Sequence, residues 1–418
     1  MKNIYFLGIH DKIQLEVTIC MDYILRKKYL SQLIEVKNTP DIKVITGIRR
    51  SGKSVLTEEY AEYLKENDAD ANLVIIRLQE LDYEELLEYH ALNSYILEHY
   101  VPGKNNVLII DEVQLCENFE KVINSIHSKR IYDIYITGSN AFLLSSDLAT
   151  LFTGRTIEIK VFPFSFSEYL QYFNTEKAID QAFDNYVRMG GMSGSYVYST
   201  EKKRYEYIKD IYDTILLRDL VQKYKIRNKS ELQQIAEFMM DNISNIHSPN
   251  SICDALNRDN SDITRKTVSK YIDYFEKAFL FYEVKRYDLK GKKYLESNKK
   301  YYLCDASFRY AINGIRNMDF GRVYENLVYL ELIRRGYEVY IGKLYKKEID
   351  FVASRHNEKI YIQVSDNISE EKTFEREYSP LLAINDAYPK MIIARTHHEP
   401  YDYRGIQIVD LPQWLCER

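Results

Sequence analysis

The stretch Ile42–Ser54, IKVITGIRRSGKS, decides the fold of this chain of 418 residues. Its first five residues, Ile42–Thr46, are mostly apolar or β-branched and predict a short buried strand. Two glycines follow, with four residues between them, and a lysine and a serine come directly after the second glycine. Val55–Lys65 then carries apolar residues at helical spacing. The stretch therefore predicts a strand, a tight loop and a helix.

The loop fits the P-loop pattern G-x-x-x-x-G-K-[ST] in the strand–loop–helix context that the pattern requires. Gly47 and Gly52 permit a tight turn whose N–H groups converge on phosphate oxygens, and the helix N-terminus adds positive partial charge. Lys53 is expected to reach the β- and γ-phosphates, and the Ser54 hydroxyl to bind Mg²⁺. The predicted nucleotide-binding residues are Gly47, Ile48, Arg49, Arg50, Ser51, Gly52, Lys53, Ser54 and Val55.

A second strand carries the acidic residues that such a site needs. Asn106–Glu112, NVLIIDE, has four consecutive apolar residues, which predict a strand buried on both faces. Ligands of open α/β sheets bind at the carboxyl ends of the strands, where Asp111 and Glu112 would lie. We expect Asp111 to hold Mg²⁺ and Glu112 to polarise the attacking water.

A third predicted strand, Ile131–Thr137, ends in Gly138-Ser139-Asn140. A polar side chain there could contact the γ-phosphate, and we favour Asn140 over Ser139. Arg155 stands just before another predicted strand, Ile157–Phe162.

The P-loop, LIIDE, ITGSN, LFTGR and PFSFSEYL occur in the order that resembles the AAA+ superfamily. More narrowly, the chain from about Met21 to its end resembles a bacterial and archaeal group of ATPases with a C-terminal domain of unknown function. The resemblance implies ATP as the nucleotide, a sensor-1 role for Asn140, and an arginine-finger role for Arg155. An arginine finger acts on a neighbouring subunit, so the resemblance also implies a homo-oligomer. Arg188 and Arg218 are weaker candidates for a sensor-2-like cation.

The middle of the chain predicts helices followed by a hairpin. Lys202–Lys225 fits the helical lid of an AAA+ core, because apolar residues recur at three- and four-residue spacing. Three more helices and two strands then follow the winged-helix order. The predicted ranges are Ser230–Ser244 with a serine N-cap, Ser251–Asn257, Ile263–Phe279 with Thr264 as N-cap, Leu280–Tyr287 and Lys293–Cys304.

Charge indicates a nucleic-acid partner for this part. Residues 265–300 hold eleven Lys or Arg against five Asp or Glu, a net charge of +6 in a chain whose total is −5. Such clustering is typical of phosphate contacts, although a solvated face of a protein-binding winged helix explains it as well. The candidate contacts to duplex DNA are Arg265, Lys266, Lys270, Lys290, Lys292 and Lys293.

The last part resembles the PD-(D/E)xK nucleases. Glu325 lies on a predicted helix, Phe320–Arg335, and Asp350 on a predicted strand, Lys347–Ala353. The next strand has Gln363-Val364-Ser365 where those nucleases have a carboxylate and a lysine. Without them Mg²⁺ loses a charged ligand and the nucleophile loses its supporting cation. We therefore expect a nuclease-like fold without nuclease activity; Glu325, Asp350 and Gln363 forming a residual metal or binding pocket is the alternative.

Composition sets the remaining expectations. The five cysteines are scattered, which is typical of reduced thiols in a cytoplasmic protein, and no apolar run approaches the ~18 residues of a membrane span. Tyrosine is in excess, with 38 Tyr against 17 Phe. Composition bias is the simpler explanation, and an aromatic nucleic-acid surface is the alternative. Residues 1–20 are expected to be a mis-called start or a poorly packed arm.

The sequence thus predicts an α/β chain in five parts: the extension 1–20, an AAA+ core at 21–170, a helical lid at 171–228, a winged helix at 229–305 and a degenerate nuclease-like domain at 306–418. The favoured function is Mg²⁺-dependent ATP hydrolysis coupled to a DNA-associated activity. The alternative is a nucleotide-switched signalling or scaffold ATPase whose C-terminal half binds protein. An active nuclease ranks last.

Overall fold

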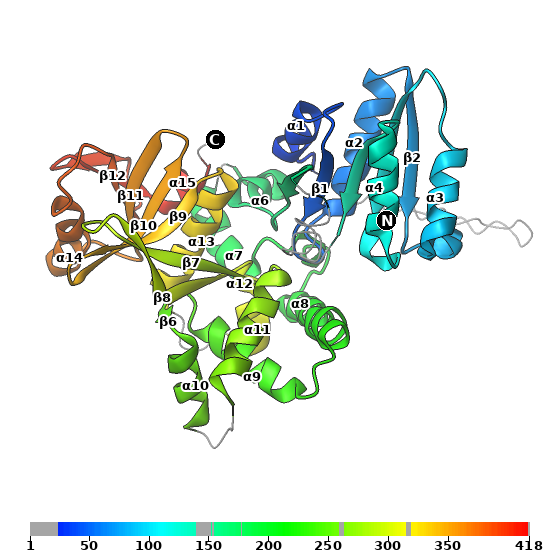
Figure 1. Cartoon of the computed structure of the whole chain (residues 1–418). Helices are drawn as coiled ribbons and strands as arrows, with labels where there is room; N and C mark the ends of the chain where they lie inside the picture. The colour runs from blue at the N-terminus through cyan, green and yellow to red at the C-terminus, as the bar shows by residue number, and fades with distance from the viewer. Residues whose placement is uncertain are drawn as a thin grey trace, which may run out of the picture.

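The computed structural model describes residues 24–138, 152, 154–176, 178–258, 263–314 and 319–416. The predicted extension 1–20 and the predicted sensor Asn140 lie outside the described residues. Figure 1 shows two sheets at opposite sides of the molecule, with a group of helices below and between them.

The first sheet has five parallel strands in the order β2-β3-β4-β1-β5. The strands are β1 Ile42–Thr46, β2 Ala71–Arg77, β3 Asn105–Asp111, β4 Asp133–Thr137 and β5 Thr156–Lys160. The β3 residues from Val107 onward are buried, as predicted for a strand covered on both faces. The carboxyl ends of β1, β3 and β4 meet at one edge of the sheet, because these strands are parallel neighbours.

Helices cover both faces of this sheet. Apolar residues of α1 (Lys27–Glu35) and α2 (Lys53–Asn67) pack on one face with Ile45, Ile109 and Tyr135. Residues of α3 (Tyr89–Glu98) and α4 (Phe119–Lys129) pack on the other face. Short 3₁₀ turns lie at η1 Leu81–Leu87, η2 Val113–Leu115 and η4 Ser193–Ser195.

The helical part begins with α6 Phe166–Phe173, α7 Ile179–Met189 and α8 Glu201–Thr214. The helix predicted over Lys202–Lys225 changes at Ile215 into a π-helix, η5 Ile215–Gln222. Its buried residues, Ile215, Leu216, Leu220 and Val221, keep the apolar face that the spacing predicted.

The elements predicted for the winged helix follow in order. They are α9 Lys229–Asp241, α10 Pro249–Asn257, α11 Arg265–Lys277, β7 Phe281–Asp288 and β8 Lys293–Leu303. A two-residue strand that was not predicted, β6 Ile246–His247, lies between α9 and α10. The side chain of Thr264 caps α11, as expected. The N-cap of α9 is Asn228, not a serine, because the Asn228 side chain accepts the N–H of Glu231.

The hairpin β7–β8 belongs to two structures at once. At the base of the hairpin, β8 is paired with β6. The outer half of β7 is paired in parallel with β9, where Asp288 lies opposite Lys343. A nine-stranded sheet, β13-β14-β12-β11-β10-β9-β7-β8-β6, therefore runs across the predicted boundary between 305 and 306. The remaining elements are α12 Ala306–Asn313, α13 Phe320–Arg334, β9 Glu338–Leu344, β10 Lys347–Arg355, β11 Glu358–Ser365, α14 Glu371–Leu382, β12 Lys390–Ala394, β13 Tyr401–Tyr403, β14 Ile406–Asp410 and α15 Leu411–Cys416.

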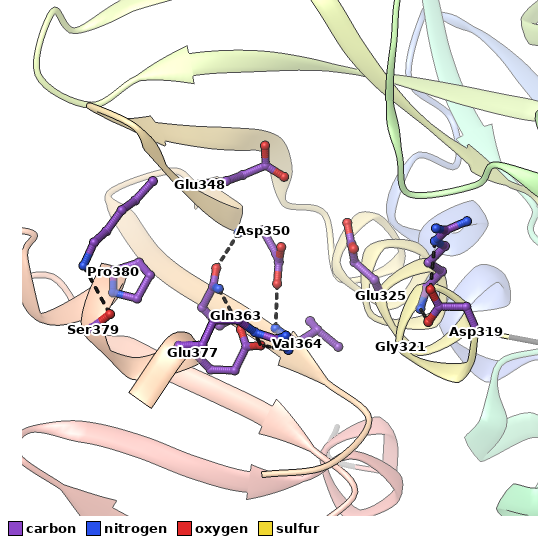
Figure 2. Close-up of a pocket in the computed structure, with 13 residues that line it drawn as sticks. Asp319, Gly321, Glu325, Glu348, Asp350, Gln363, Val364, Glu377, Ser379 and Pro380 are labelled. Atoms are coloured by element: carbon purple, nitrogen blue, oxygen red, sulfur yellow. Dashed lines mark hydrogen bonds and ion pairs between the residues drawn. The ribbon is translucent and has the colours of Figure 1, made fainter. Parts of the chain in front are cut away.

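A polar pocket of about 490 Å³ lies where α13, β10, β11 and α14 meet. Figure 2 shows the side chains of Glu325, Asp350, Gln363 and Glu377 around it.

The pair Gly190-Gly191 fits the helical part against the C-terminal half. The carboxylate of Asp305 lies only 2.0 Å from where a Cβ of Gly190 would stand, and it accepts the Gly191 N–H at 2.5 Å. A side chain at Gly190 would displace this carboxylate, so the glycine has a packing role.

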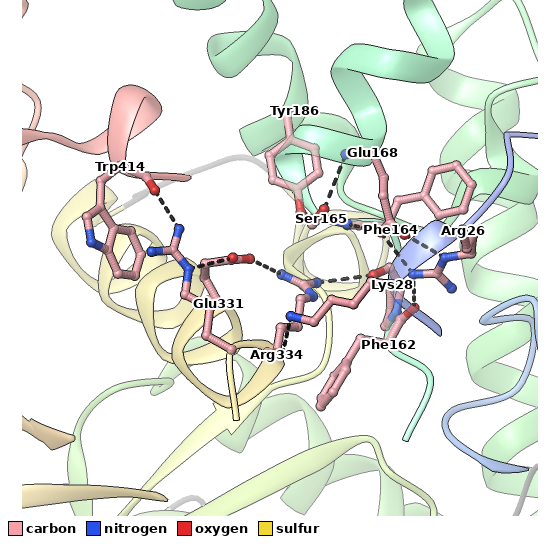
Figure 3. Close-up of polar contacts among 12 residues, drawn as sticks. Arg26, Lys28, Phe162, Phe164, Ser165, Glu168, Tyr186, Glu331, Arg334 and Trp414 are labelled. Carbon is pink, nitrogen blue, oxygen red and sulfur yellow. Dashed lines mark hydrogen bonds and ion pairs between the residues drawn. The ribbon is translucent and has the colours of Figure 1, made fainter. Parts of the chain in front are cut away.

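A buried arginine joins the first sheet to the rest of the chain. Arg26 is 4% exposed and forms two hydrogen bonds with the Glu168 carboxylate, at 2.7 and 2.9 Å. Its other donors reach the carbonyls of Ser51, in the P-loop, and Phe162, after β5, at 2.9 and 3.0 Å. One guanidinium therefore holds the P-loop, the end of β5 and α6 together (Figure 3).

The same cluster continues into α13. Arg334 donates to the Pro163 carbonyl at 3.2 Å and lies 3.5 Å from Glu331. Glu331 also pairs with Arg335 at 2.9 Å, and Arg335 donates to the Trp414 carbonyl at 2.6 Å (Figure 3). Hydrogen bonds from Arg334 and Arg335 to backbone carbonyls thus connect α13 to the segment after β5 and to α15, while Glu331 pairs with both arginines.

Replacing Glu168 with alanine should lower the free energy of unfolding by about 3–5 kcal/mol, because it leaves a buried guanidinium without its partner. Denaturant titration followed by the fluorescence of Trp414, the single tryptophan of the chain, measures this change. Glu62→Ala is the matched control. Glu62 pairs with Lys65 but is 65% exposed, so its loss should cost less than about 1 kcal/mol. Equal losses in the two variants would contradict the role given to Arg26.

Candidate functional site

The loop after β1 has the backbone that phosphate binding requires. Gly47 has φ 142° and Gly52 has φ 94°, conformations that disfavour other residues. A Cβ at Gly47 would also lie 2.1 Å from the Val161 carbonyl oxygen, so the loop can turn here only with glycine. Helix α2 begins at Lys53, directly after the loop, and its N-terminal N–H groups face the site.

Two side chains of the loop are arranged for an anion. Lys53 is 4% exposed, and its ammonium donates to the carbonyls of Gly47 and Ile48, both at 3.1 Å. Burial lowers its pKa, and the negative charges of Glu112 and Asp111 oppose this effect. In the described part of the chain, the buried Ser51 hydroxyl has no hydrogen-bond partner. These donors fit the phosphates of a nucleotide.

The predicted Mg²⁺ ligands lie together. The Ser54 hydroxyl donates to Asp111 at 2.8 Å, although the two residues are far apart in sequence. Thr137, at the end of β4, donates to the other oxygen of Asp111. Burial raises the pKa of Asp111, and the hydrogen bonds from Thr137 and Ser54 oppose this effect. A hydroxyl and a carboxylate are ligands that Mg²⁺ accepts, so this pair fits the ion.

Glu112 is held in an unusual backbone conformation. Its φ is 53°, in the left-handed region that non-glycine residues rarely adopt. Its N–H donates to Thr137 Oγ1 at 3.0 Å, and its carboxylate accepts from Gln114. Such strain concentrates at functional sites, which supports a role for this carboxylate. The sequence analysis missed Thr137, whose only signal is its position at the carboxyl end of β4.

The lid contacts the P-loop through a second ion pair. Arg49 makes two hydrogen bonds to the Asp219 carboxylate, at 2.8 and 3.0 Å, and Asp219 lies on η5. Both side chains are mostly buried, at 16% and 11% exposure. The hydrogen bonds to Asp219 raise the pKa of Arg49. The sequence gave no sign of this pair, and the neighbouring candidate Arg218 is exposed, as is Arg188.

Arg155 does not lie near the P-loop of its own chain. It precedes β5 at the end where Ile42 pairs with Thr156, whereas the P-loop follows the opposite end of β1. Arg155 is exposed. Its predicted action on a neighbouring subunit stays a prediction.

The six predicted DNA contacts fall into two groups. Arg265, Lys266 and Lys270 are exposed on the first turns of α11. Lys290, Lys292 and Lys293 lie at the outer end of the β7–β8 hairpin, which is fixed to β9 by the Leu289 N–H to Lys343 carbonyl bond of 3.0 Å. The rest of α11 and the eight residues of β7 lie between the two groups along the chain. The hairpin end is therefore part of the C-terminal sheet and not a free wing beside α11.

A lysine that the sequence did not predict contacts the carboxylates that line the C-terminal pocket. Lys300 of β8 places its ammonium 2.9 Å from Glu325, 2.8 Å from Glu348 and 3.8 Å from Asp350. Lys300 is buried. The burial of Asp350 itself and the nearby negative charge of Glu325 raise the pKa of Asp350 to about 8. The expectation that no cation remains near Asp350 was wrong, since the sequence motif considers only β11 and Lys300 comes from another strand.

Gln363 takes the position where the nuclease motif has a carboxylate. Its side-chain oxygen accepts the Asp350 N–H at 2.7 Å, and its side-chain nitrogen donates to Glu377 of α14 at 3.0 Å (Figure 2). Among the described residues, no three His, Cys, Asp or Glu side chains are placed to hold one metal ion.

Comparison with known proteins agrees with this reading of the first domain. Residues 39–170 match the model of the AAA domain, and residues 180–319 match a domain of unknown function, DUF8612. The fold and the P-loop therefore define a P-loop ATPase of the AAA class.

Two relatives cover most of the chain. An uncharacterized protein of Haemophilus influenzae is 36% identical over 94% of this chain and 99% of its own length. The uncharacterized protein MJ1544 of Methanocaldococcus jannaschii is 30% identical over 82% of this chain and 79% of its own. The chain therefore belongs to the same family as these two proteins, and in this chain DUF8612 follows the AAA domain of a P-loop ATPase.

Solved structures are less similar. The Walker-type ATPase PABY2304 of Pyrococcus abyssi superimposes with a TM-score of 0.46 at 15% identity, over 70% of this chain and 96% of that one. The ORC1 protein of Aeropyrum pernix in complex with DNA gives a TM-score of 0.32 at 12% identity, over 75% and 94% of the two chains. Within the described residues, no helix has both the length and the apolar character needed to cross a membrane.

Asp219→Ala should weaken ATP binding by about tenfold, because the lid loses its bidentate partner on the P-loop. A double-mutant cycle with Arg49→Ala should give a coupling energy of at least about 1 kcal/mol. Titration of a fluorescent ATP analogue measures all four dissociation constants. Additive effects of the two substitutions would contradict a direct role for the pair in holding the lid.

Proposed function

We propose that this protein binds and hydrolyses ATP with Mg²⁺, and that hydrolysis is coupled to an activity on DNA. The observation that carries the first half is the pairing of Ser54 with Asp111 beside a P-loop closed by Lys53. A hydroxyl, a carboxylate and an ammonium converge there in the arrangement that phosphoryl transfer uses.

The residues of the chain act by position and charge. Lys53, freed from the carbonyls of Gly47 and Ile48, neutralises the β- and γ-phosphate oxygens. Glu112 accepts a proton from the attacking water and orients it toward the γ-phosphate. Thr137 holds Asp111 and the Glu112 backbone in place through its hydroxyl. In this proposal Asn140 acts as the sensor-1 residue, and Arg155 of a neighbouring subunit acts as the arginine finger.

Ser54 and Asp111 would hold Mg²⁺, which offsets charge on the phosphates when it is bound. Asp111 would lose the Ser54 hydrogen bond but keep that of Thr137, so its orientation is preserved.

Glu112→Gln should retain ATP binding within about threefold and lower the ATPase rate by at least about 100-fold, because the amide cannot accept the proton. Lys53→Ala should lose binding as well as hydrolysis. Phosphate release and nucleotide titration, measured on each variant, separate the two effects. A Glu112→Gln protein that hydrolyses ATP at the wild-type rate would show that the base lies elsewhere.

The DNA half of the proposal rests on α11. Its N-terminal turns present Arg265, Lys266 and Lys270 to solvent, and the order α9-β6-α10-α11-β7-β8 is that of a winged helix. An exposed helix with three cations on adjacent turns suits the phosphates of duplex DNA.

The C-terminal domain is proposed to be nuclease-like without cutting DNA. The proposal is supported by the succession of one helix and three strands, α13-β9-β10-β11, which carries Glu325, Asp350 and Gln363. The Lys300 ammonium, however, lies among Glu325, Glu348 and Asp350 and supplies the positive charge that a metal would bring. Gln363 removes a further charged ligand from the same pocket.

Duplex DNA should bind with an affinity that falls steeply with salt and should change the ATPase rate. The variant Lys266→Ala with Lys270→Ala should reduce the slope of log K against log salt by about 2, because two phosphate contacts are lost. Anisotropy of a labelled duplex and phosphate release give the two quantities. Lys65→Ala with Lys104→Ala, a pair of lysines on the first domain, is the charge-matched control.

Absence of duplex binding at low salt, with and without ATP, would favour the signalling or scaffold ATPase instead. The same incubations with Mg²⁺ or Mn²⁺ report on cutting. DNA of unchanged length supports an inactive nuclease-like domain, whereas fragments that disappear in Asp350→Ala would overturn it.

A further inference from the structure

One face of the nine-stranded sheet carries a row of neighbouring tyrosines on strands β7, β8 and β9. Tyr294 of β8 pairs with Tyr287 of β7, and the ring of Tyr294 lies 5.4 Å from that of Tyr287 and 5.0 Å from that of Tyr340 on β9. Tyr294 is 56% exposed. The ammonium of Lys359, on β11, lies 5.5 Å from the centre of the Tyr287 ring, so a cation stands beside the row. We call Tyr287, Tyr294 and Tyr340 the tyrosine row.

Two hairpin ends meet beside this row. Asp288 pairs with both Lys293 and Lys343, which places the turn after β7 next to the turn after β9. These two turns contain six lysines and one aspartate, and the lysines are Lys290, Lys292, Lys293, Lys343, Lys346 and Lys347. The aspartate is Asp288, whose carboxylate accepts the backbone N–H groups of Lys290 and Gly291. Within the described residues none of the six lysines forms an ion pair with a carboxylate. Lys347 donates to the Ser379 hydroxyl at 3.2 Å and lines the polar pocket, so the charge beside the tyrosine row comes from the other five.

Tyr345 occupies the turn after β9 in a strained conformation. Its φ is 58°, where a two-residue hairpin turn favours Gly, Asn or Asp, and its ring is 67% exposed. The ring packs on little of its own chain, and the Lys290 ammonium lies 4.7 Å from its centre. A bulky residue in this region costs stability, and no buried contact compensates for an exposed ring. The ring is therefore better explained by a partner that it contacts.

We propose that the tyrosine row, Tyr345 and the surrounding lysines bind single-stranded nucleic acid. Unpaired bases stack on exposed aromatic rings, and lysines spaced along a strand edge contact the phosphates between them. A sheet face with aromatic side chains on adjacent strands is a recurring surface for this purpose. Duplex DNA fits less well, because its bases are stacked on one another and cannot reach the tyrosines.

This surface is separate from α11 and from the ATP site, so the proposal does not depend on the function proposed for either. It also gives part of the tyrosine excess a role. The rings that take part lie on β7, β8, β9 and the β9–β10 turn. The β7–β8 hairpin and β9 are far apart in sequence and are brought together by the parallel pairing of β7 with β9.

Binding of labelled 20-nucleotide oligo-dT and oligo-U to the full chain, measured by anisotropy at several salt concentrations, tests the proposal. Tyr294→Ala and Tyr345→Gly should each raise the dissociation constant by about tenfold, whereas Tyr294→Phe should retain binding within about threefold because stacking needs the ring and not the hydroxyl. Tyr345→Gly also relieves the backbone strain, so its thermal stability should be unchanged or higher while binding falls. Tyr401→Ala, an exposed tyrosine on β13, is the control and should bind as the wild type does.

The lysines are tested separately. Lys290→Ala with Lys292→Ala should lower the slope of log K against log salt by about 1.4, since each contact to a single strand contributes about 0.7. Lys65→Ala with Lys104→Ala, the charge-matched pair on the first domain, should leave oligo-dT binding unchanged. Oligo-dT binding is measured without ATP and without duplex DNA, so failure of the ATPase or duplex proposals is distinguishable from failure here.

Any of three results would overturn the proposal. The first is that neither oligonucleotide binds at about 50 mM salt or below, and the second is that polyglutamate, which has charge but no bases, binds with equal affinity. The third is wild-type affinity in both Tyr294→Ala and Tyr345→Gly. The first or the third result would leave composition bias as the explanation of the tyrosine excess. The second would favour an acidic protein as the partner.

Discussion

The guanidinium of Arg26 is buried, so its N–H donors need hydrogen-bond partners within the protein. Glu168 supplies the opposite charge, while the carbonyls of Ser51 and Phe162 take the remaining donors. A buried charge left without such partners costs several kcal/mol, so the P-loop, the end of β5 and α6 hold their positions together or lose them together. Arg334 and Glu331 extend this constraint into α13, and Arg335 extends it to Trp414. The P-loop is thereby connected to α13 through buried arginines that donate to the carbonyls of Ser51, Phe162 and Pro163.

The lid is tied to the same loop by a different pair. Arg49 of the P-loop pairs with Asp219 of η5, and Arg26 donates to the carbonyl of Ser51 in the same loop. Two separate contacts therefore fix the backbone of the P-loop. The proposed hydrolysis has a structural route to the helical part through η5 and to the C-terminal sheet through α13. Because β7 and β8 belong to both the α9–α11 region and the C-terminal sheet, a displacement of one of these parts would displace the other.

The sequence predicted the fold well where function and local pattern coincide. Strand β1, the P-loop, strand β3 with Asp111, the helices from α8 to α11 and the strands β9 to β11 all occur close to the expected ranges. It predicted the C-terminal pocket less well, because Lys300 reaches Asp350 from a strand that the nuclease motif does not include, and Glu377 reaches Gln363 from α14. Likewise Arg26, Thr137 and Asp219 have no motif around them. Each acts through a partner more than 20 residues away in the chain, and spacing along a sequence contains no information on such pairs.

By itself, the sequence determined the strand–loop–helix of a P-loop ATPase, since the glycines, Lys53 and Ser54 are local requirements of the backbone and of the helix N-terminus. It also determined that a second strand would bring Asp111 and Glu112 to a sheet edge. Only the tertiary structure decided which edge, which neighbours and which charges surround them, because β-sheet pairing joins segments by register and not by distance along the chain. The same pairing moved three lysines of the expected wing onto the end of the C-terminal sheet. There they stand beside tyrosines whose number had seemed to be a matter of composition alone.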